Sequence, residues 1–204
     1  MTSYAVLETT PTSLPVLRPM NNKNNTAHWP PLLIEEYFAG RTTAWGLFRD
    51  RFGVVRRQFN VSIDGTWDDE TLTLVEDFVY DDGEKERRIW TIEKIGDGTY
   101  SGRADGVIGA ASGRAHANTL NWRYRFALNV GTRTWHVTFD DWLFLQSDGV
   151  LINRADVTKF GFRLGEVVLV FVKQAADLST AGDGAEAMET IVNPSGQGGG
   201  VSCL

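Results

Sequence analysis

The side chains best suited to chemistry in this sequence are acids and bases in phase with apolar residues on predicted strands. Glu76 shares a face with Leu74, and Arg88 shares a face with Trp90 on the following segment. An Asp82-Gly83 turn joins the two segments, so Glu76 and Arg88 are expected to lie close together inside the fold. A buried carboxylate without a cation is costly, which favours this pairing. The pair either fixes the strand register or lets Arg88 hold an anionic head group.

A second acid–base pair is predicted on a later hairpin, whose turn is Ser147-Asp148-Gly149. Alternation with Phe139 turns Asp141 inward, where it would face Arg154 across the hairpin, beside Asn153. Adjacent carboxylates such as Asp140 and Asp141 serve acid–base chemistry or bind a hard cation. The alternative is one inward ion pair and one solvated aspartate, and we expect no metal site.

A third arginine, Arg57, is in phase with Phe59 and is predicted to point inward as well. Three inward arginines against two carboxylates predict a slightly cationic interior inside an acidic protein. Such an interior favours an apolar ligand with an anionic or carbonyl head. The residues that define this charge balance are Arg57, Arg88, Arg154, Glu76 and Asp141.

His116 precedes an aromatic segment and is in phase with Trp122. It either acts as a base at the mouth of the fold or is held by a backbone carbonyl. The sequence shows no nucleophile elbow, phosphate loop or dinucleotide fingerprint. We therefore expect no cofactor.

Strict alternation of apolar and polar residues dominates the middle of the chain and is typical of half-buried strands. No helical pattern of ten residues interrupts it, so we predict an all-β fold: an antiparallel up-and-down barrel of about 8–10 strands, with a two-sheet sandwich as the alternative. A short helix is predicted between the prolines at 30–31 and Gly40. Turns are predicted at Asp64-Gly65, Asp82-Gly83, Gly96-Asp97-Gly98, Ser112-Gly113 and Ser147-Asp148-Gly149.

Composition divides the chain into three parts. Residues 1–29 are rich in proline and asparagine and are predicted to be a flexible arm; residues 174–204 are rich in glycine, alanine and serine and are predicted to be a flexible tail. Residues 30–173 are the predicted folded domain. Cys203, the single cysteine, is expected to be an exposed thiol of the tail.

The overall charge limits the partners. The formal net charge of −6 argues against nucleic acid, which usually binds a basic face. No segment reads as a signal peptide or a membrane span, so we expect a cytoplasmic or otherwise soluble protein with no stable membrane anchor. The sequence leaves the oligomeric state open.

Several motifs together resemble a known family. The opening motifs are Tyr37-Phe38-Ala39-Gly40, Ala44-Trp45-Gly46 and Arg56-Arg57-Gln58-Phe59, and the middle ones are Gly65-Thr66-Trp67, Arg88-Ile89-Trp90 and Tyr100-Ser101-Gly102. The most specific motifs are Asp140-Asp141-Trp142, Leu151-Ile152-Asn153-Arg154-Ala155, Lys159-Phe160-Gly161 and Gly165-Glu166-Val167. Over residues 34 to 173 the chain resembles an uncharacterised family of bacterial lipoprotein-like proteins with a domain of unknown function.

The resemblance implies a lipocalin-like (calycin) barrel and, by association with genes that modify membrane fatty acids, a lipid-like ligand. Typical members start with a lipoprotein signal and an acylated cysteine. The N-terminal arm has neither, so anchoring in an envelope membrane is not expected.

Two functions fit these observations. The first is binding of a lipid-like or isoprenoid-like molecule, and the second is a cofactor-independent isomerase or cyclase in the same cavity, with Asp141, Glu76 or His116 moving protons. A third possibility is an interior fully packed with side chains, without a ligand. The predicted ligand-binding residues are Arg57, Arg88, Arg154, Asn153, Tyr124, Trp90, Trp122, Phe59, Phe78 and Phe139.

Overall fold

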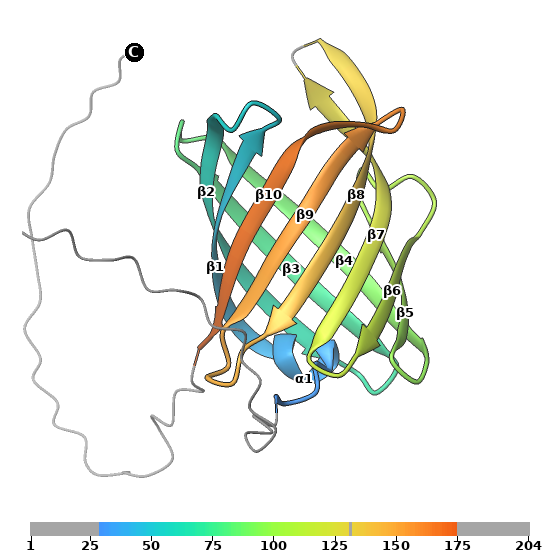
Figure 1. The fold of residues 1–204 in the computed structure, drawn as a ribbon. Helices are drawn as coiled ribbons and strands as arrows, with labels where there is room; N and C mark the ends of the chain where they lie inside the picture. Colours follow the sequence, from blue (N-terminus) through green and yellow to red (C-terminus); the bar gives the residue numbers. More distant parts are fainter. Residues whose placement is uncertain (1–28, 131, 175–204) are drawn as a thin grey trace, which may run out of the picture. The chain divides into compact units, whose positions relative to one another are not determined.

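Ten antiparallel strands and one short helix make up residues 29–130 and 132–174, the part of the chain that the computed structural model describes (Figure 1). Each strand pairs with its sequence neighbours, and β1 also pairs with β10 to close a barrel. This confirms the predicted up-and-down barrel and shows that the sandwich is wrong. The elements are α1 (Ile34–Phe38), β1 (Gly40–Asp50), β2 (Val55–Trp67), β3 (Thr71–Tyr80), β4 (Lys85–Gly96), β5 (Thr99–Ala104), β6 (Ala111–His116), β7 (Thr119–Val130), β8 (Arg133–Leu145), β9 (Leu151–Lys159) and β10 (Phe162–Lys173).

The predicted arm and tail lie outside the described residues, except for Trp29 and Gln174. Cys203 lies outside them too. Within the described residues, no helix has the length and apolar character needed to cross a membrane.

The period-two pattern produces the two faces of the wall. On β2, for example, Val61 and Ile63 are buried in the barrel while Ser62 between them is exposed. On β3, Leu72 and Leu74 point inward in the same way. Because every second residue enters the barrel, the side chains at those positions define the interior.

Two of the predicted turns are instead parts of strands. Asp82-Gly83 and Ser147-Asp148-Gly149 form turns, with Gly83 and Gly149 at positive φ. Asp64-Gly65 lies inside β2 and Ser112-Gly113 inside β6, so those two turn predictions are wrong. A Cβ at Gly65 would come within 1.9 Å of the Phe38 carbonyl oxygen, and one at Gly113 within 2.4 Å of the Trp122 ring. These glycines allow close approach of a neighbour rather than a change of chain direction.

Helix α1 lies across one end of the barrel (Figure 1). Its Ile34 and Phe38 side chains line the interior. The buried Glu35 carboxylate accepts hydrogen bonds from Tyr100 Oη (2.8 Å) on β5 and Lys94 Nζ (2.5 Å) on β4. These contacts tie the helix to the barrel wall, so the interior is closed at this end.

Candidate ligand-binding cavity

A cavity of about 990 Å³ occupies the barrel interior. It extends from Ile34 and Phe38 of α1 to Glu84 and Lys85, two exposed residues at the opposite end of the barrel. The prediction of a fully packed interior is therefore wrong. The six aromatic residues predicted to contact a ligand all line this cavity: Phe59, Phe78, Trp90, Trp122, Tyr124 and Phe139.

Aromatic rings form much of the cavity wall. Tyr124 and Phe139, from neighbouring strands, stack with ring centroids 5.0 Å apart and planes only 4° apart. Trp90 meets Trp122 edge to face at 5.7 Å. Trp122 lies against Gly113, and the missing Cβ there lets the indole sit close to the wall. Rings held in this way leave space in the middle of the barrel while presenting a broad apolar surface.

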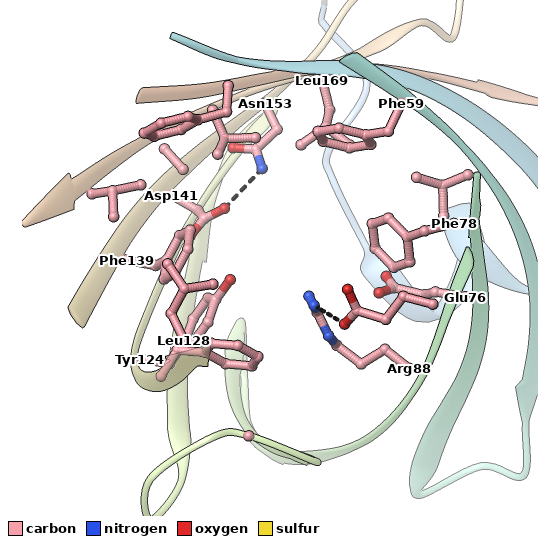
Figure 2. Close-up of a pocket in the computed structure, with 18 of the residues that line it drawn as sticks. Phe59, Glu76, Phe78, Arg88, Tyr124, Leu128, Phe139, Asp141, Asn153 and Leu169 are labelled. Carbon is pink, nitrogen blue, oxygen red and sulfur yellow. Dashed lines mark hydrogen bonds and ion pairs between the residues drawn. The ribbon is translucent and has the colours of Figure 1, made fainter. Parts of the chain in front are cut away.

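One wall, made by β3 and β4, carries a buried cation. Glu76 and Arg88 are cross-strand partners, as predicted, and both line the cavity (Figure 2). The hydrogen bond of the Arg88 guanidinium, however, goes from Nη2 to Glu86 Oε1 (2.5 Å), a residue two positions earlier on β4. The Arg88 guanidinium also lies over the rings of Phe78 and Phe126, at 5.1 and 4.9 Å. Its Nε is buried without a hydrogen-bond partner among the described residues.

Burial raises the pKa of Glu76 to about 7, and the positive charge of Arg88 offsets part of that rise. Glu86 behaves differently: burial acts to raise its pKa, but Arg88 and the Tyr80 hydroxyl, which donates to Oε2 at 2.8 Å, lower it overall. Arg88 is thus hydrogen-bonded to Glu86, and the charge of Glu76 acts on it as well. Glu76 remains able to exchange a proton near neutral pH.

The opposite wall, made by β8 and β9, carries Asp141 and Asn153 (Figure 2). Both residues are buried, and Asn153 Nδ2 donates to Asp141 Oδ1 at 2.8 Å. Burial raises the pKa of Asp141 to about 7. The remaining oxygens, Asp141 Oδ2 and Asn153 Oδ1, have no hydrogen-bond partner among the described residues.

The predicted Asp141–Arg154 pair is wrong. Arg154 stands opposite Trp142 on β8, while Ala155 stands opposite Asp141. Alternation along β9 turns Asn153 inward and therefore Arg154 outward. On the outer surface Arg154 pairs with Asp156 (3.1 Å) and Glu166 (3.0 Å), so it cannot meet a ligand in the cavity.

Arg57 does line the cavity, but it lies at the solvent-exposed end. Its guanidinium pairs with Asp82 and Glu84 and stacks over the Tyr80 ring, with 3.5 Å from Cζ to the ring centroid. Arg57 is therefore neutralised and is not the spare cation that the sequence suggested.

His116 is the exposed last residue of β6 and is not among the residues that line the cavity. Its backbone carbonyl accepts a hydrogen bond from Thr119 Oγ1 at 2.8 Å. Its predicted role as a base would therefore have to be exercised outside this cavity wall.

The expected cationic interior is also wrong, because carboxyls outnumber cations along the described cavity wall. The cations are Arg57, Lys85 and Arg88, and the carboxyl-bearing residues are Asp50, Glu76, Glu84, Glu86, Asp105 and Asp141. Glu86 was not predicted to line the cavity, although it shares the phase of Arg88 on the same strand. No group of three or more histidine, cysteine or acidic side chains in the described ranges is arranged to hold a metal ion.

Comparison with known proteins identifies the family and supports the fold. The model of the DUF3833 family, proteins of unknown function, matches residues 14–173. Among curated proteins, no sequence is similar enough to match. The structure of the S-type phycobiliprotein lyase CPES from Guillardia theta is similar, with a TM-score of 0.52 and 10% sequence identity, over 70% of this chain and 92% of that one. At that identity the similarity concerns the barrel fold alone. The chain belongs to the DUF3833 family of proteins of unknown function.

Proposed function

We propose that the barrel binds a small apolar molecule, lipid-like or isoprenoid-like, with its polar end in the middle of the cavity. The observation that carries this proposal is the aromatic-walled cavity of about 990 Å³. Ligand pockets for small molecules typically have volumes of ~300–1,000 Å³ and mostly apolar walls with a few polar groups.

A carbonyl head fits this cavity better than an anionic one. Arg88 is the cation deepest in the cavity, and Glu86 already neutralises it. Its buried Nε–H has no partner in the described structure and can donate to a carbonyl oxygen. A carboxylate would instead add negative charge beside Glu76 and Glu86.

Binding is tested on the purified full-length protein by native mass spectrometry, organic extraction and titration with Nile red. We expect either a co-purified small molecule or saturable Nile red fluorescence. Ala155→Phe, which adds a ring to the cavity wall beside Asp141, should weaken Nile red binding at least tenfold. Ser62→Phe adds the same ring on the outer face of β2 and should leave binding unchanged. A protein without extractable ligand that also fails to bind Nile red contradicts the proposal.

A second candidate function, a cofactor-independent isomerase or cyclase, is favoured by Glu76 and Asp141. Both carboxyls face the same cavity and both have a pKa of about 7, the range in which one group can donate and accept protons at neutral pH. Arg88, Tyr124 or Asn153 would polarise a carbonyl of the substrate.

Catalysis is tested by incubating the extracted molecule with the protein in D₂O. Proton transfer at carbon would introduce deuterium, and Asp141→Asn and Glu76→Gln should each abolish its incorporation while the protein stays folded. An unchanged isotope pattern with the wild-type protein would reject this function and leave binding intact.

A further inference from the structure

When Asp141 is ionised, its side chain and the free Asn153 oxygen make the wall opposite Arg88 an acceptor surface. An ionised carboxylate can only accept, so the Asn153 amide turns its N–H groups toward Asp141 and its oxygen away. This leaves Asp141 Oδ2 and Asn153 Oδ1 as two neighbouring acceptors, both buried and both without a partner in the described structure. Buried polar atoms are nearly always hydrogen-bonded in folded proteins, so this pair takes its donor from the contents of the cavity, either water or a ligand that displaces it.

The charges around the cavity favour the same kind of group. On the two polar walls, three carboxyl-bearing residues, Glu76, Glu86 and Asp141, accompany one cation, Arg88. An anionic group placed against Asp141 would meet like charge at short range in a poorly hydrated site. A neutral O–H or N–H, or an ammonium group, would instead relieve the excess of carboxyls.

The two polar walls lie across the barrel from each other. In the closed order of ten strands, β8 is five places from β3, and β9 is five places from β4, so each pair is diametrically opposed. Figure 2 shows Arg88 and Glu76 on one side of the cavity, with Asp141 and Asn153 on the other. A molecule that spans the cavity therefore meets a donor wall at Arg88 and an acceptor wall at Asp141. Beside Asp141, on the same side of the cavity, the stacked rings of Tyr124 and Phe139 supply an apolar surface.

We infer that the ligand is a two-ended apolar molecule whose O–H, N–H or ammonium group donates to Asp141 Oδ2 and Asn153 Oδ1. Its second polar group, of the carbonyl type, lies at Arg88. This inference rests on the proposed binding function and defines the chemistry of its ligand. Of the anionic or carbonyl head expected from the sequence, it keeps the carbonyl and adds a hydrogen-bond donor at the opposite wall.

The experiment compares four probes of one chain length as competitors of Nile red at pH 8, below their micelle concentrations. Dodecan-1-ol and dodecylamine carry donors, methyl laurate carries only acceptors, and laurate is an anion. We expect the alcohol and the amine to displace Nile red at concentrations about tenfold lower than methyl laurate, the effect of one charge-assisted hydrogen bond. Laurate should be the weakest of the four.

Asp141→Leu should remove the preference for the alcohol and the amine, and Asn153→Leu, which keeps the Asp141 carboxylate, should reduce it, while methyl laurate binds as before. Arg154→Leu, on the outer face of β9, is the matched control and should keep the preference. If near-UV circular dichroism shows that Asp141→Leu does not fold, the preference measured with Asn153→Leu is the test of the inference. Equal displacement by all four probes, or strongest displacement by laurate, overturns the inference but not the binding function. Absence of Nile red binding to the wild-type protein overturns both.

Discussion

The outer and inner faces of the barrel wall each carry a network of arginines and carboxylates, and the two are built differently. Outside, the buried Glu166 carboxylate is surrounded by cations. Oε1 accepts from Arg49, and Oε2 accepts from Arg154 and Arg163 at 3.0 and 2.8 Å. The hydrogen bond from Arg49 is the largest influence that lowers the pKa of Glu166. Both carboxylate oxygens are satisfied.

Inside, the proportions are reversed. One cation, Arg88, lies between Glu76 and Glu86, and the one side-chain partner of Asp141 among the described residues is the Asn153 amide. Buried atoms without partners remain on both sides of the cavity. A network in which every polar atom has a hydrogen-bond partner can serve stability alone. A network beside a cavity that leaves polar atoms without partners can still bind a ligand.

The largest expected effect comes from removing the inner cation. Arg88→Met leaves the partly buried Glu76 and Glu86 without the cation between them and should lower the free energy of unfolding by about 3 kcal/mol. Urea denaturation of the ligand-free protein measures this change. Arg87→Met is the control, because Arg87 is exposed and pairs with Asp77 on the outer face, where a loss within ~0.5 kcal/mol is expected. Similar losses in both variants would mean that the inner network is no more important than the outer surface.

The pH dependence of stability should distinguish the inner carboxyls from the outer one. The pKa of Asp141 is raised by burial to about 7 in the folded state, so the folded protein holds its proton more tightly than the unfolded chain does. Stability should therefore fall as pH rises from about 4 to 7. Asp141→Asn should remove roughly 2 kcal/mol of the decrease between pH 5 and 7, since each pKa unit corresponds to about 1.4 kcal/mol. Denaturation curves at pH 5, 6 and 7 provide the test, and a parallel decrease in both proteins would contradict it.

Removing the outer carboxylate should have a smaller effect in the opposite pH range. Glu166→Gln loses three charge-assisted hydrogen bonds, but its partners are about half exposed, so we expect a cost of about 1.5 kcal/mol at pH 7. Because the folded-state pKa of Glu166 is lowered, its contribution is present above the ordinary value of 4.5 and disappears as pH falls through the folded-state value. The variant and the wild type should therefore converge in stability at acidic pH. A difference that persists at low pH would assign the cost to packing.

The smallest effect is expected for one outer arginine. Arg49→Gln should cost at most about 0.5 kcal/mol, because Arg154 and Arg163 still neutralise Glu166. Nile red binding should stay unchanged. A cost comparable to that of Glu166→Gln would show that Arg49 alone holds the outer network together.

Local alternation was enough to predict which face of a strand most of the interior residues occupy. It placed Glu76, Arg88 and Asp141 inside, and it paired Glu76 with Arg88 through a short turn. The same rule contradicts the prediction of both Asn153 and Arg154 as ligand contacts, since consecutive residues on a strand face opposite sides. The inward phase of Leu151 and Asn153 on β9 was the signal that could have excluded Arg154.

Glycine was the least informative residue type. Gly83 and Gly113 have the same chemistry, yet one is in a turn with positive φ and the other is beneath the Trp122 ring. A glycine that permits a turn and a glycine that permits close packing look alike in sequence, because both need only the absence of a Cβ.

By itself, the sequence determined the all-β class, the short helix and the inward phase of the interior residues, since period-two alternation and turn chemistry act over a few residues. Only the tertiary structure decided how many strands close the barrel, and hence whether its aromatic rings meet or leave a cavity. Closure also sets Asp141 and Asn153 opposite Arg88 across that cavity, although more than 50 residues separate Arg88 from Asp141. Which buried atoms remain without partners depends on such distant contacts, and no local pattern encodes them.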